Sequence, residues 1–146
     1  MKRLLQYALL ALSLCAVFTA PVFATEITVY KSATCGCCKE WVKHLQANGF
    51  SVKAQDVSDL MSYKTANGVP AKLGSCHTAT VNGYVIEGHV PANDIKRLLK
   101  ERPAVSGLAV PGMPVGSPGM EQGGQKDRYD VLTFNKQGGT SVYARY

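Results

Sequence analysis

Hydrophobic and polar positions after residue 24 repeat with two different periods, which predicts strands that alternate with helices. Residues 26–31 alternate polar and apolar side chains and are rich in β-branched residues, so they predict a first strand. Residues 39–48 carry apolar side chains at helical spacing and end at an Asn-Gly pair, which predicts a helix. The same two patterns recur as a second strand over residues 50–54 and a second helix over residues 57–67.

The middle of the chain predicts a β-hairpin followed by a third helix. Residues 76–81 and 84–87 are rich in strand-forming residues and flank an Asn-Gly pair, the strongest short hairpin signal. Pro91 opens a segment with an apolar stripe at helical spacing, and Pro103 ends it. The predicted order of elements is therefore β-α-β-α-β-β-α.

Glycine and proline dominate the next segment. They are so frequent over residues 104–124 that we expect a loop without helix or strand. Met113 and Met120 each follow a Pro-Gly pair in this loop, where a methionine is either a hydrophobic plug or a soft thioether ligand. Residues 129–135 and 140–146 then predict a terminal hairpin.

The first 24 residues have the pattern of a secretory signal peptide. A positively charged start precedes an apolar stretch over residues 4–20, and small residues before Thr25 offer a cleavage site. A signal anchor is the alternative, but the apolar stretch is only marginally long enough to span a bilayer. We expect cleavage after Ala24, contact with the membrane only before cleavage, and a single domain over residues 25–146 in the periplasm.

Composition and charge limit the kind of partner. The chain has 146 residues, of which 46% are hydrophobic, so it can form one globular domain with its own core. The formal net charge of +6 is modest, and two of the basic residues lie in the leader. The remaining Lys and Arg are scattered along the sequence, so we expect no nucleic acid partner.

The candidate chemistry lies in four cysteines of the mature chain: Cys35, Cys37, Cys38 and Cys76. Three of them stand between the first predicted strand and the first predicted helix. The N–H groups and the dipole at a helix start stabilise a thiolate, which is both a nucleophile and a metal ligand. Thiols oxidise outside the cytoplasm, so two disulfides are possible, although the neighbours Cys37 and Cys38 are poorly placed to join each other. A bound metal ion is the other way to protect thiolates.

The order of elements, with a Cys-x-x-Cys pair at the first strand-to-helix turn, resembles the thioredoxin-like fold and its glutaredoxin branch. This resemblance implies an α/β fold. The chain departs from that fold at two places. The interior of the Cys-x-x-Cys is Gly36-Cys37, without proline, and Ser75-Cys76-His77 stands where the fold usually has a cis-proline. If the resemblance holds, all four cysteines converge.

Three functions are open to such a cluster, and the first is a soft-metal site. Neighbours on a helix diverge by about 100°, so Cys37 and Cys38 do not easily aim at one ion, whereas bridging thiolates can serve several ions. Four thiolates carry four negative charges, which one Zn(II) cancels by half and four Cu(I) cancel in full. Charge balance therefore favours a polynuclear copper cluster.

The second function is a thiol–disulfide oxidoreductase, with Cys35 as the nucleophile and Cys38 as the resolving thiol. The third is a zinc site or structural disulfide without activity. The metal content of the purified protein separates the first function from the second, and disulfide-reductase activity separates the second from the third. We expect neither a hydrolase nor a transferase.

Four motifs together make the mature chain similar to a known family. They are Thr-Cys-Gly-Cys-Cys at residues 34–38, Ser-Cys-His-Thr at 75–78, Glu-Gly-His-Val-Pro at 87–91, and two Pro-Gly-Met segments over residues 111–121. Through them the chain, roughly from residue 27 to its end, resembles the CopG family of periplasmic copper-resistance proteins. The resemblance implies a thioredoxin-like fold and a role in handling copper or in its redox conversion. It also implies a cysteine-bridged multinuclear Cu(I) site formed by Cys35, Cys37, Cys38 and Cys76.

The resemblance leaves the histidines open. Four roles are open for His77 and His89. Each is a metal ligand, a hydrogen-bond donor to a ligand, a proton carrier, or a half-buried histidine without a role in the site. His44 lies among polar residues on the first helix, so we expect it at the surface. Storage, delivery and Cu(I)/Cu(II) conversion of copper are equally open, as are the number of ions and any partner among other periplasmic copper-handling proteins.

Overall fold

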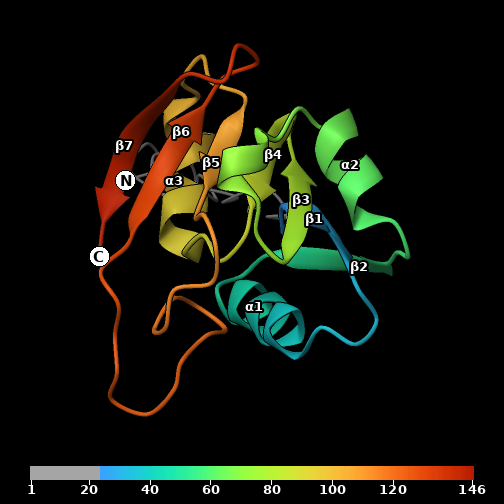
Figure 1. Cartoon of the computed structure of the whole chain (residues 1–146), viewed down its shortest axis with the longest axis vertical. Coiled ribbons are helices and arrows are strands. Elements are labelled where there is room, and N and C mark those ends of the chain that lie inside the picture. The colour runs from blue at the N-terminus through green and yellow to red at the C-terminus, as the bar shows by residue number, and fades with distance from the viewer. Residues whose placement is uncertain (1–23) are drawn as a thin grey trace, which may run out of the picture.

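Seven strands form one mixed sheet in the order β2-β1-β3-β4-β5-β6-β7 (Figure 1). The computed structural model describes residues 24–146, so the predicted signal peptide lies outside the described residues except for Ala24. The elements are β1 (Glu26–Lys31), α1 (Gly36–Ala47), β2 (Ser51–Asp56), α2 (Leu60–Ala66), a short 3-10 helix (Ala71–Leu73), β3 (His77–Val81), β4 (Tyr84–Glu87), α3 (Ala92–Glu101), β5 (Gly107–Ala109), β6 (Asp130–Phe134) and β7 (Thr140–Arg145).

The seven strands and helices predicted up to Pro103 are all present, in the predicted order. β1 pairs in parallel with β2 and antiparallel with β3, and β3 forms a hairpin with β4. The turn of this hairpin places Asn82 at φ 46° and Gly83 at φ 84°. Both values are left-handed, as a tight two-residue hairpin turn requires, so the hairpin prediction is confirmed.

The pairing register assigns each helix to a face of the sheet. Residues directly opposite each other on neighbouring strands point to the same face. Tyr30 lies opposite Thr78, which lies opposite Glu87, and this row faces α2, where Tyr63 stacks on Tyr30 at 4.4 Å between ring centroids. The alternate row faces α1 and α3. The main hydrophobic core on that side includes Ile27, Val29, Trp41, Leu45, Ala79, Ile86, Ile95 and Leu98.

Helix α1 begins three residues earlier than the expected residue 39. The reason is a cap made by a cysteine, because Cys35 Sγ accepts the backbone N–H of Cys38 at 3.3 Å. Cys37 and Cys38 therefore lie in the first turn of the helix rather than in a turn before it. Helix α2 begins later than the expected residue 57, because Asp59 caps it by accepting the N–H of Ser62 at 3.1 Å.

The expectation of a loop throughout residues 104–124 is wrong at one place. β5 lies in this segment and pairs in parallel with β4 and antiparallel with β6. A Cβ at Gly107 would lie 1.8 Å from the carbonyl oxygen of Val85, so this strand needs glycine where it meets β4. Only the two neighbouring strands make this short, glycine-containing segment extended. The predicted terminal hairpin is confirmed, and it continues the same sheet as β6 and β7.

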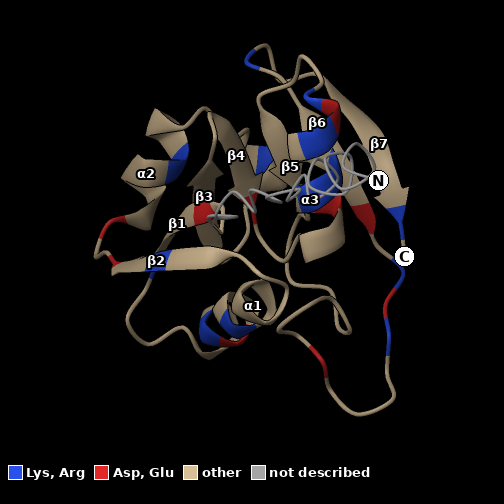
Figure 2. Cartoon of the chain, turned by 180° about the vertical axis from the view of Figure 1, so that it is seen from behind, with Lys and Arg blue, Asp and Glu red and all other residues tan. Residues whose placement is uncertain are grey.

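The outcome is a mixed α/β fold, as expected from the sequence. Within residues 24–146, none of the helices has the length and apolar character needed to cross a bilayer. Lys and Arg are spread over several elements in the view of Figure 2, with Asp and Glu among them.

Candidate metal centre

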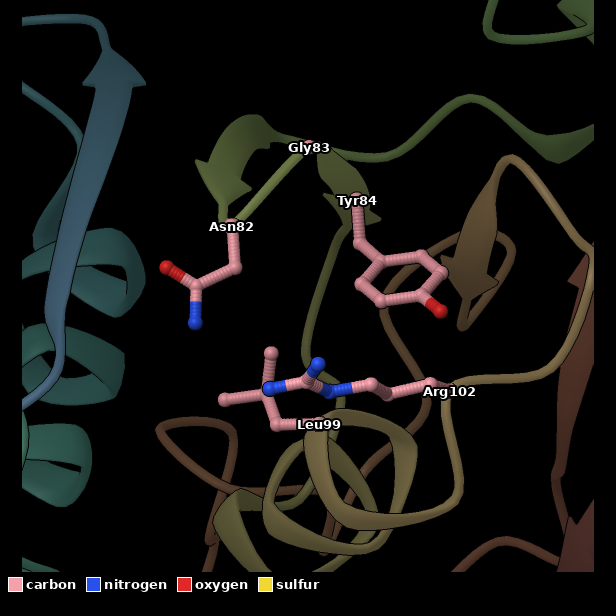
Figure 3. Close-up of a pocket in the computed structure, with 5 residues that line it drawn as sticks. All are labelled: Asn82, Gly83, Tyr84, Leu99 and Arg102. Carbon is pink, nitrogen blue, oxygen red and sulfur yellow. The ribbon is translucent and has the colours of Figure 1, made fainter.

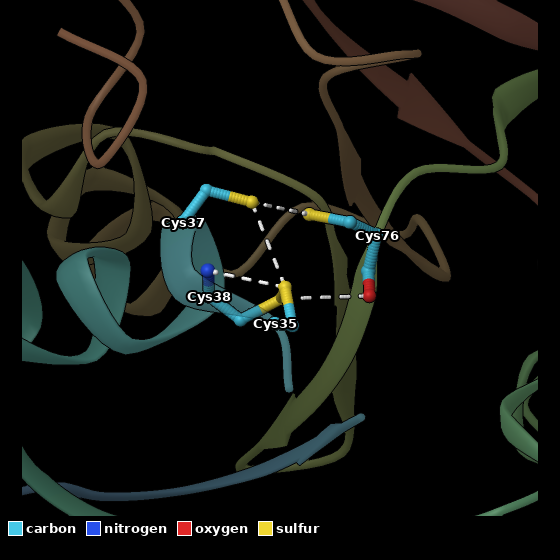
Figure 4. Close-up of side chains that lie close together, drawn as sticks. All are labelled: Cys35, Cys37, Cys38 and Cys76. Atoms are coloured by element: carbon cyan, nitrogen blue, oxygen red, sulfur yellow. Dashed lines mark hydrogen bonds between the residues drawn. A yellow bond between two sulfur atoms is a disulfide. The ribbon is translucent and has the colours of Figure 1, made fainter. Parts of the chain in front are cut away.

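The four cysteines of the described chain converge from two segments that are distant in sequence (Figure 4). Strand β1 leads into Cys35 and the first turn of α1, and Cys76 immediately precedes β3. In the antiparallel pairing of these strands, Lys31 at the end of β1 lies opposite His77 at the start of β3. This register places Cys76 beside the start of α1. All four sulfur atoms lie within 4.8 Å of one another, so the predicted convergence is confirmed.

Cys37 is the central thiol of this group. Its Sγ lies 3.6 Å from Cys35 Sγ and 3.7 Å from Cys76 Sγ. Cys38 is fully buried, and its Sγ lies 3.6 Å from the carbonyl oxygen of Cys76. Cys37 and Cys38 are neighbours on the helix, yet their sulfur atoms lie within 4.8 Å of each other, while Cys38 Sγ is joined to Cys35.

A disulfide joins Cys35 and Cys38, the pair assigned from sequence to the roles of nucleophile and resolving thiol. Cys37 and Cys76 are the free thiols among the described residues. The structure thus holds the four-sulfur group in a half-oxidised state. Four thiolates are available to metal ions only after this disulfide is reduced.

His89 contacts the thiol of Cys76 directly. Its Nε2 lies 2.9 Å from Cys76 Sγ, and its Nδ1 lies 2.8 Å from the carbonyl oxygen of Pro118. A carbonyl oxygen can only accept, so Nδ1 carries the proton and the lone pair of neutral Nε2 faces Cys76. Burial lowers the pKa of His89 and raises the pKa of Cys76 to about 12, the latter helped by nearby Cys37. Without metal, Cys76 is a thiol that donates to His89.

His77 is fully buried on the face of the sheet that carries α1. Its ring packs on Trp41 at 4.3 Å between centroids and meets the ring of His89 edge-on at 4.9 Å. Its Nδ1 lies 3.3 Å from Cys76 Sγ, whereas its Nε2 has no hydrogen-bond partner in the described part of the chain. Burial holds the pKa of His77 well below its usual value, so the ring is neutral.

A buried ion pair on the other face of the sheet supports the segment that carries Cys76. Glu87 and Lys64 are in contact and almost fully buried, and the hydroxyl of Thr78 donates to Glu87 at 2.7 Å. Glu87 also accepts the backbone N–H of Ser75 at 2.6 Å, which fixes the residue next to Cys76. Sequence reasoning missed this pair because Lys64 is a charged residue on a short helix, and no local pattern marks it as buried.

Comparison with known proteins places the chain in a family. Two solved structures, named "Copper resistance protein copG- Form 1" and "Copper resistance protein copG- Form 2", each share 50% sequence identity with the chain at a TM-score of 0.81. The matches cover 85% of this chain and 98% and 99% of the respective solved chains. The chain belongs to the CopG family.

Two further comparisons accompany this result. A family model described as "Protein of unknown function, DUF411" matches residues 73–120, a range that contains Cys76 and both histidines next to it but not the first three cysteines. A search of curated proteins gave no match. The family assignment of this chain therefore rests on the solved structures.

The glycine-rich loop before β6 packs on the start of α1, next to the four cysteines. A Cβ at Gly119 would lie 2.7 Å from the backbone N of Trp41 and 2.8 Å from the carbonyl oxygen of Cys37, so the loop backbone lies directly on the first turn of α1. Ser75 Oγ donates to the carbonyl oxygen of Gly112 at 2.5 Å. Met113 follows Gly112 and is 52% exposed. The loop thus brings both methionine segments to the border of the site, and a ligand role for Met113 or Met120 stays a prediction.

His44 has a structural role that sequence reasoning did not foresee. It is half-buried rather than at the surface, and its Nε2 accepts the backbone N–H of Ala92 at 3.1 Å. Helix α3 follows Pro91, which has no side-chain cap to offer, so His44 supplies the cap from α1. Burial lowers the pKa of His44, which keeps its Nε2 free to accept.

A cavity of 320 Å³ lies at the opposite end of β3 from Cys76 (Figure 3). It is lined by the hairpin turn and the end of α3, with Asn82, Gly83, Tyr84, Leu99 and Arg102 around it. No cysteine or histidine is among these residues, so this cavity is separate from the four cysteines.

Proposed function

We propose that this chain handles copper in the periplasm and contributes to copper resistance by holding several Cu(I) ions in a cysteine-bridged cluster. Cys35, Cys37, Cys38 and Cys76 are the ligands once the disulfide is reduced. The observation that carries this proposal is the convergence of the four sulfur atoms within 4.8 Å. The solved relatives named copper resistance protein support copper as the metal.

The sulfur spacing is compatible with shared metal ions. Two sulfur ligands on one tetrahedral ion with metal–sulfur bonds of about 2.3 Å lie about 3.8 Å apart. Cys37 Sγ lies 3.6 Å and 3.7 Å from its two sulfur neighbours, so little movement is needed for it to bridge ions. Soft thiolates select Cu(I), and four Cu(I) cancel the charge of four thiolates in this partly buried place.

The remaining features of the proposal concern the whole chain. A signal peptide over residues 1–24 delivers a single domain of residues 25–146 to the periplasm. The order β-α-β-α-β-β-α, with cysteines at the first strand-to-helix turn, supports a thioredoxin-like arrangement extended by β5, β6 and β7. Other periplasmic copper-handling proteins are then the natural donors and acceptors of the metal.

Redox conversion of copper extends the same proposal. The reduced Cys35 and Cys38 pair can give two electrons when it forms its disulfide and releases two protons. Two Cu(II) ions that take one electron each become two Cu(I) ions, so electrons and charges balance. The disulfide in the structure shows that these two cysteines are close enough for this step.

The disulfide also favours a second candidate, a thiol–disulfide oxidoreductase that uses Cys35 and Cys38. Such an enzyme would not need the other two thiols. Replacement of Cys37 and Cys76 by Ser would then leave disulfide-reductase activity almost intact in the metal-free protein. We expect little such activity in the wild type, and copper sensitivity in cells that carry either single replacement.

Anaerobic reconstitution tests the proposed cluster. The mature protein is fully reduced, its four thiols are counted, and it is titrated with Cu(I) against a chelator of known affinity. We expect several copper ions per chain, all lost when the four cysteines are alkylated beforehand. A reduced wild type that takes up a single copper ion or none contradicts the cluster.

A further inference from the structure

Three Asn-Gly pairs occur in the chain, at residues 48–49, 67–68 and 82–83. Asparagine is thermolabile because the backbone nitrogen of the next residue can attack its side-chain carbonyl carbon. Glycine has no Cβ and leaves that nitrogen unshielded, so each pair is a candidate site for spontaneous deamidation. The fold places the three pairs in different surroundings and thereby decides which of them reacts.

The pair at residues 48–49 is held at the end of helix α1. Asn48 is the C-cap residue, and its Nδ2 donates to the carbonyl oxygen of His44 at 2.8 Å. The N–H of Gly49 donates to the carbonyl oxygen of Gln46 at 3.0 Å. Both the side-chain amide and the attacking nitrogen are therefore engaged in hydrogen bonds that must break before they can react.

The pair at residues 67–68 is held in the same way at the end of helix α2. Asn67 is the C-cap residue, and its Nδ2 donates to the carbonyl oxygen of Tyr63 at 2.8 Å. The N–H of Gly68 donates to the carbonyl oxygen of Thr65 at 3.0 Å. Two hydrogen bonds thus protect this pair as well.

The pair at residues 82–83 lacks this protection. Asn82 and Gly83 form the exposed turn between β3 and β4, and among the described residues neither the Asn82 amide nor the Gly83 N–H has a hydrogen-bond partner. Asn82 has a φ of 46°, a left-handed value that is uncommon for residues other than glycine. Its side chain lines the open cavity of 320 Å³ shown in Figure 3, which leaves room for the amide to rotate and for water to enter.

We propose that Asn82-Gly83 is a site of spontaneous modification, at which the folded protein converts Asn82 to aspartate and isoaspartate. The bond between Gly83 N and Asn82 Cγ forms and the bond between Cγ and Nδ2 breaks. Nδ2 leaves as ammonia and takes the proton of the Gly83 N–H. Water then opens the five-membered imide ring at either of its carbonyl carbons. The net reaction consumes one water and releases one ammonia, and nothing is oxidised or reduced.

The isoaspartate product changes the hairpin more than the aspartate product does. Opening of the ring at the main-chain carbonyl leads the backbone through Cγ and adds one carbon to a two-residue turn. That turn sets the register in which Val81 lies opposite Tyr84. We therefore expect the isoaspartate form to unfold at a lower temperature than the aspartate form. Neither the cysteines nor a metal takes part, so this proposal stands apart from the proposed function.

Peptide mapping of the aged protein tests the site. Metal-free mature protein is incubated at mildly alkaline pH, where circular dichroism shows it folded, and a parallel sample is incubated unfolded in urea. Mass spectrometry of the digests measures conversion of amide to acid at each Asn-Gly pair. In the folded sample we expect Asn82 to react at least about tenfold faster than Asn48 and Asn67, because two hydrogen bonds must break at each of those sites. In urea the three rates become similar.

Two variants complete the test. Asn82→Gly keeps a turn sequence that suits left-handed backbone and removes the reacting amide, so it abolishes the fast release of ammonia. Asn67→Ala removes another Asn-Gly pair and leaves the fast release unchanged. Equal rates at the three pairs in the folded protein, or a fast release that persists in folded Asn82→Gly, overturn the proposal.

Discussion

Cys76 lies on the opposite side of the four-cysteine cluster from helix α1. Its sulfur is the contact point between the cysteines of the helix, through Cys37, and the two buried histidines. The proposed four-thiol cluster therefore depends on Cys76. Among the four cysteines, it is the one whose sulfur contacts histidine nitrogens, at 2.9 Å for His89 and 3.3 Å for His77.

Replacement of Cys76 by Ser keeps the size of the side chain and removes the thiolate. We expect the free energy of unfolding to change by no more than about 1 kcal/mol, because the residue is only partly buried and the change is conservative. Copper binding responds far more, and the reduced variant takes up at least one Cu(I) fewer per chain than the wild type. Circular dichroism checks the fold, and a copper titration counts the ions. An unchanged count in a folded variant means that Cys76 is not a ligand.

At the scale of elements, one buried ion pair ties α2 to the strands that carry the site. Lys64 comes from α2 and Glu87 from β4, and Thr78 of β3 bonds to both side chains. Glu87 also fixes Ser75, the residue before Cys76. The Lys64–Glu87 ion pair therefore links helix α2, on one face of the sheet, to the four cysteines at the end of the sheet.

Glu87→Gln leaves the Lys64 ammonium buried without its counter-charge. Breaking a buried pair in this way costs about 3 kcal/mol or more. Glu40→Gln is the matched control, because it removes the same charge from an exposed pair with Lys43, where the loss stays below about 1 kcal/mol. Chemical denaturation of both variants measures the difference. Equal stability losses in the two variants contradict the assigned role of Glu87.

At the scale of the whole molecule, three histidines make the metal-free protein sensitive to acid. His44, His77 and His89 all have pKa values below 6.5 because of burial, so each remains neutral in the folded chain at pH values where the unfolded chain protonates it. The unfolded state then binds more protons, and stability rises with pH. The contribution of each buried, neutral histidine to the free energy of unfolding is complete above about pH 6.5. It declines as the pH falls from there towards the pKa of that histidine in the folded chain.

We therefore expect the free energy of unfolding of the metal-free protein to fall between pH 7 and pH 5. Each histidine that stays neutral contributes a slope of up to about 1.4 kcal/mol per pH unit. Urea denaturation at several pH values, with the disulfide state held constant, gives the slope. His44→Gln removes one of the three groups and lowers the slope. A stability that is flat or rises as the pH falls over this range contradicts the prediction.

The leader gives a second prediction at this scale. Because small residues precede Thr25, we expect protein recovered from the periplasm to begin at Thr25 and to lack Cys15. Intact mass spectrometry measures this directly. Protein that retains the first 24 residues and stays in the membrane fraction shows that the segment is an anchor.

The order of the first seven strands and helices and both hairpins could be predicted from the sequence alone. These features depend on local signals, such as the Asn-Gly pair at residues 82 and 83 and the spacing of apolar residues along each helix. The convergence of Cys76 with the other cysteines was also predictable, because it follows from strand order and not from the details of packing. Ligation of metal by these cysteines stays a prediction.

The remaining features could not be predicted, because they form between segments that are distant in sequence. The contacts of His89 with Cys76 and Pro118 join three segments, and the cap that His44 gives to α3 joins two helices, so no local pattern carries them. The burial of Lys64 and the extended form of β5 likewise depend on neighbours that are distant in sequence. Local patterns report the period and propensity of one segment, whereas burial, capping and hydrogen bonding between segments exist only after the segments have packed together.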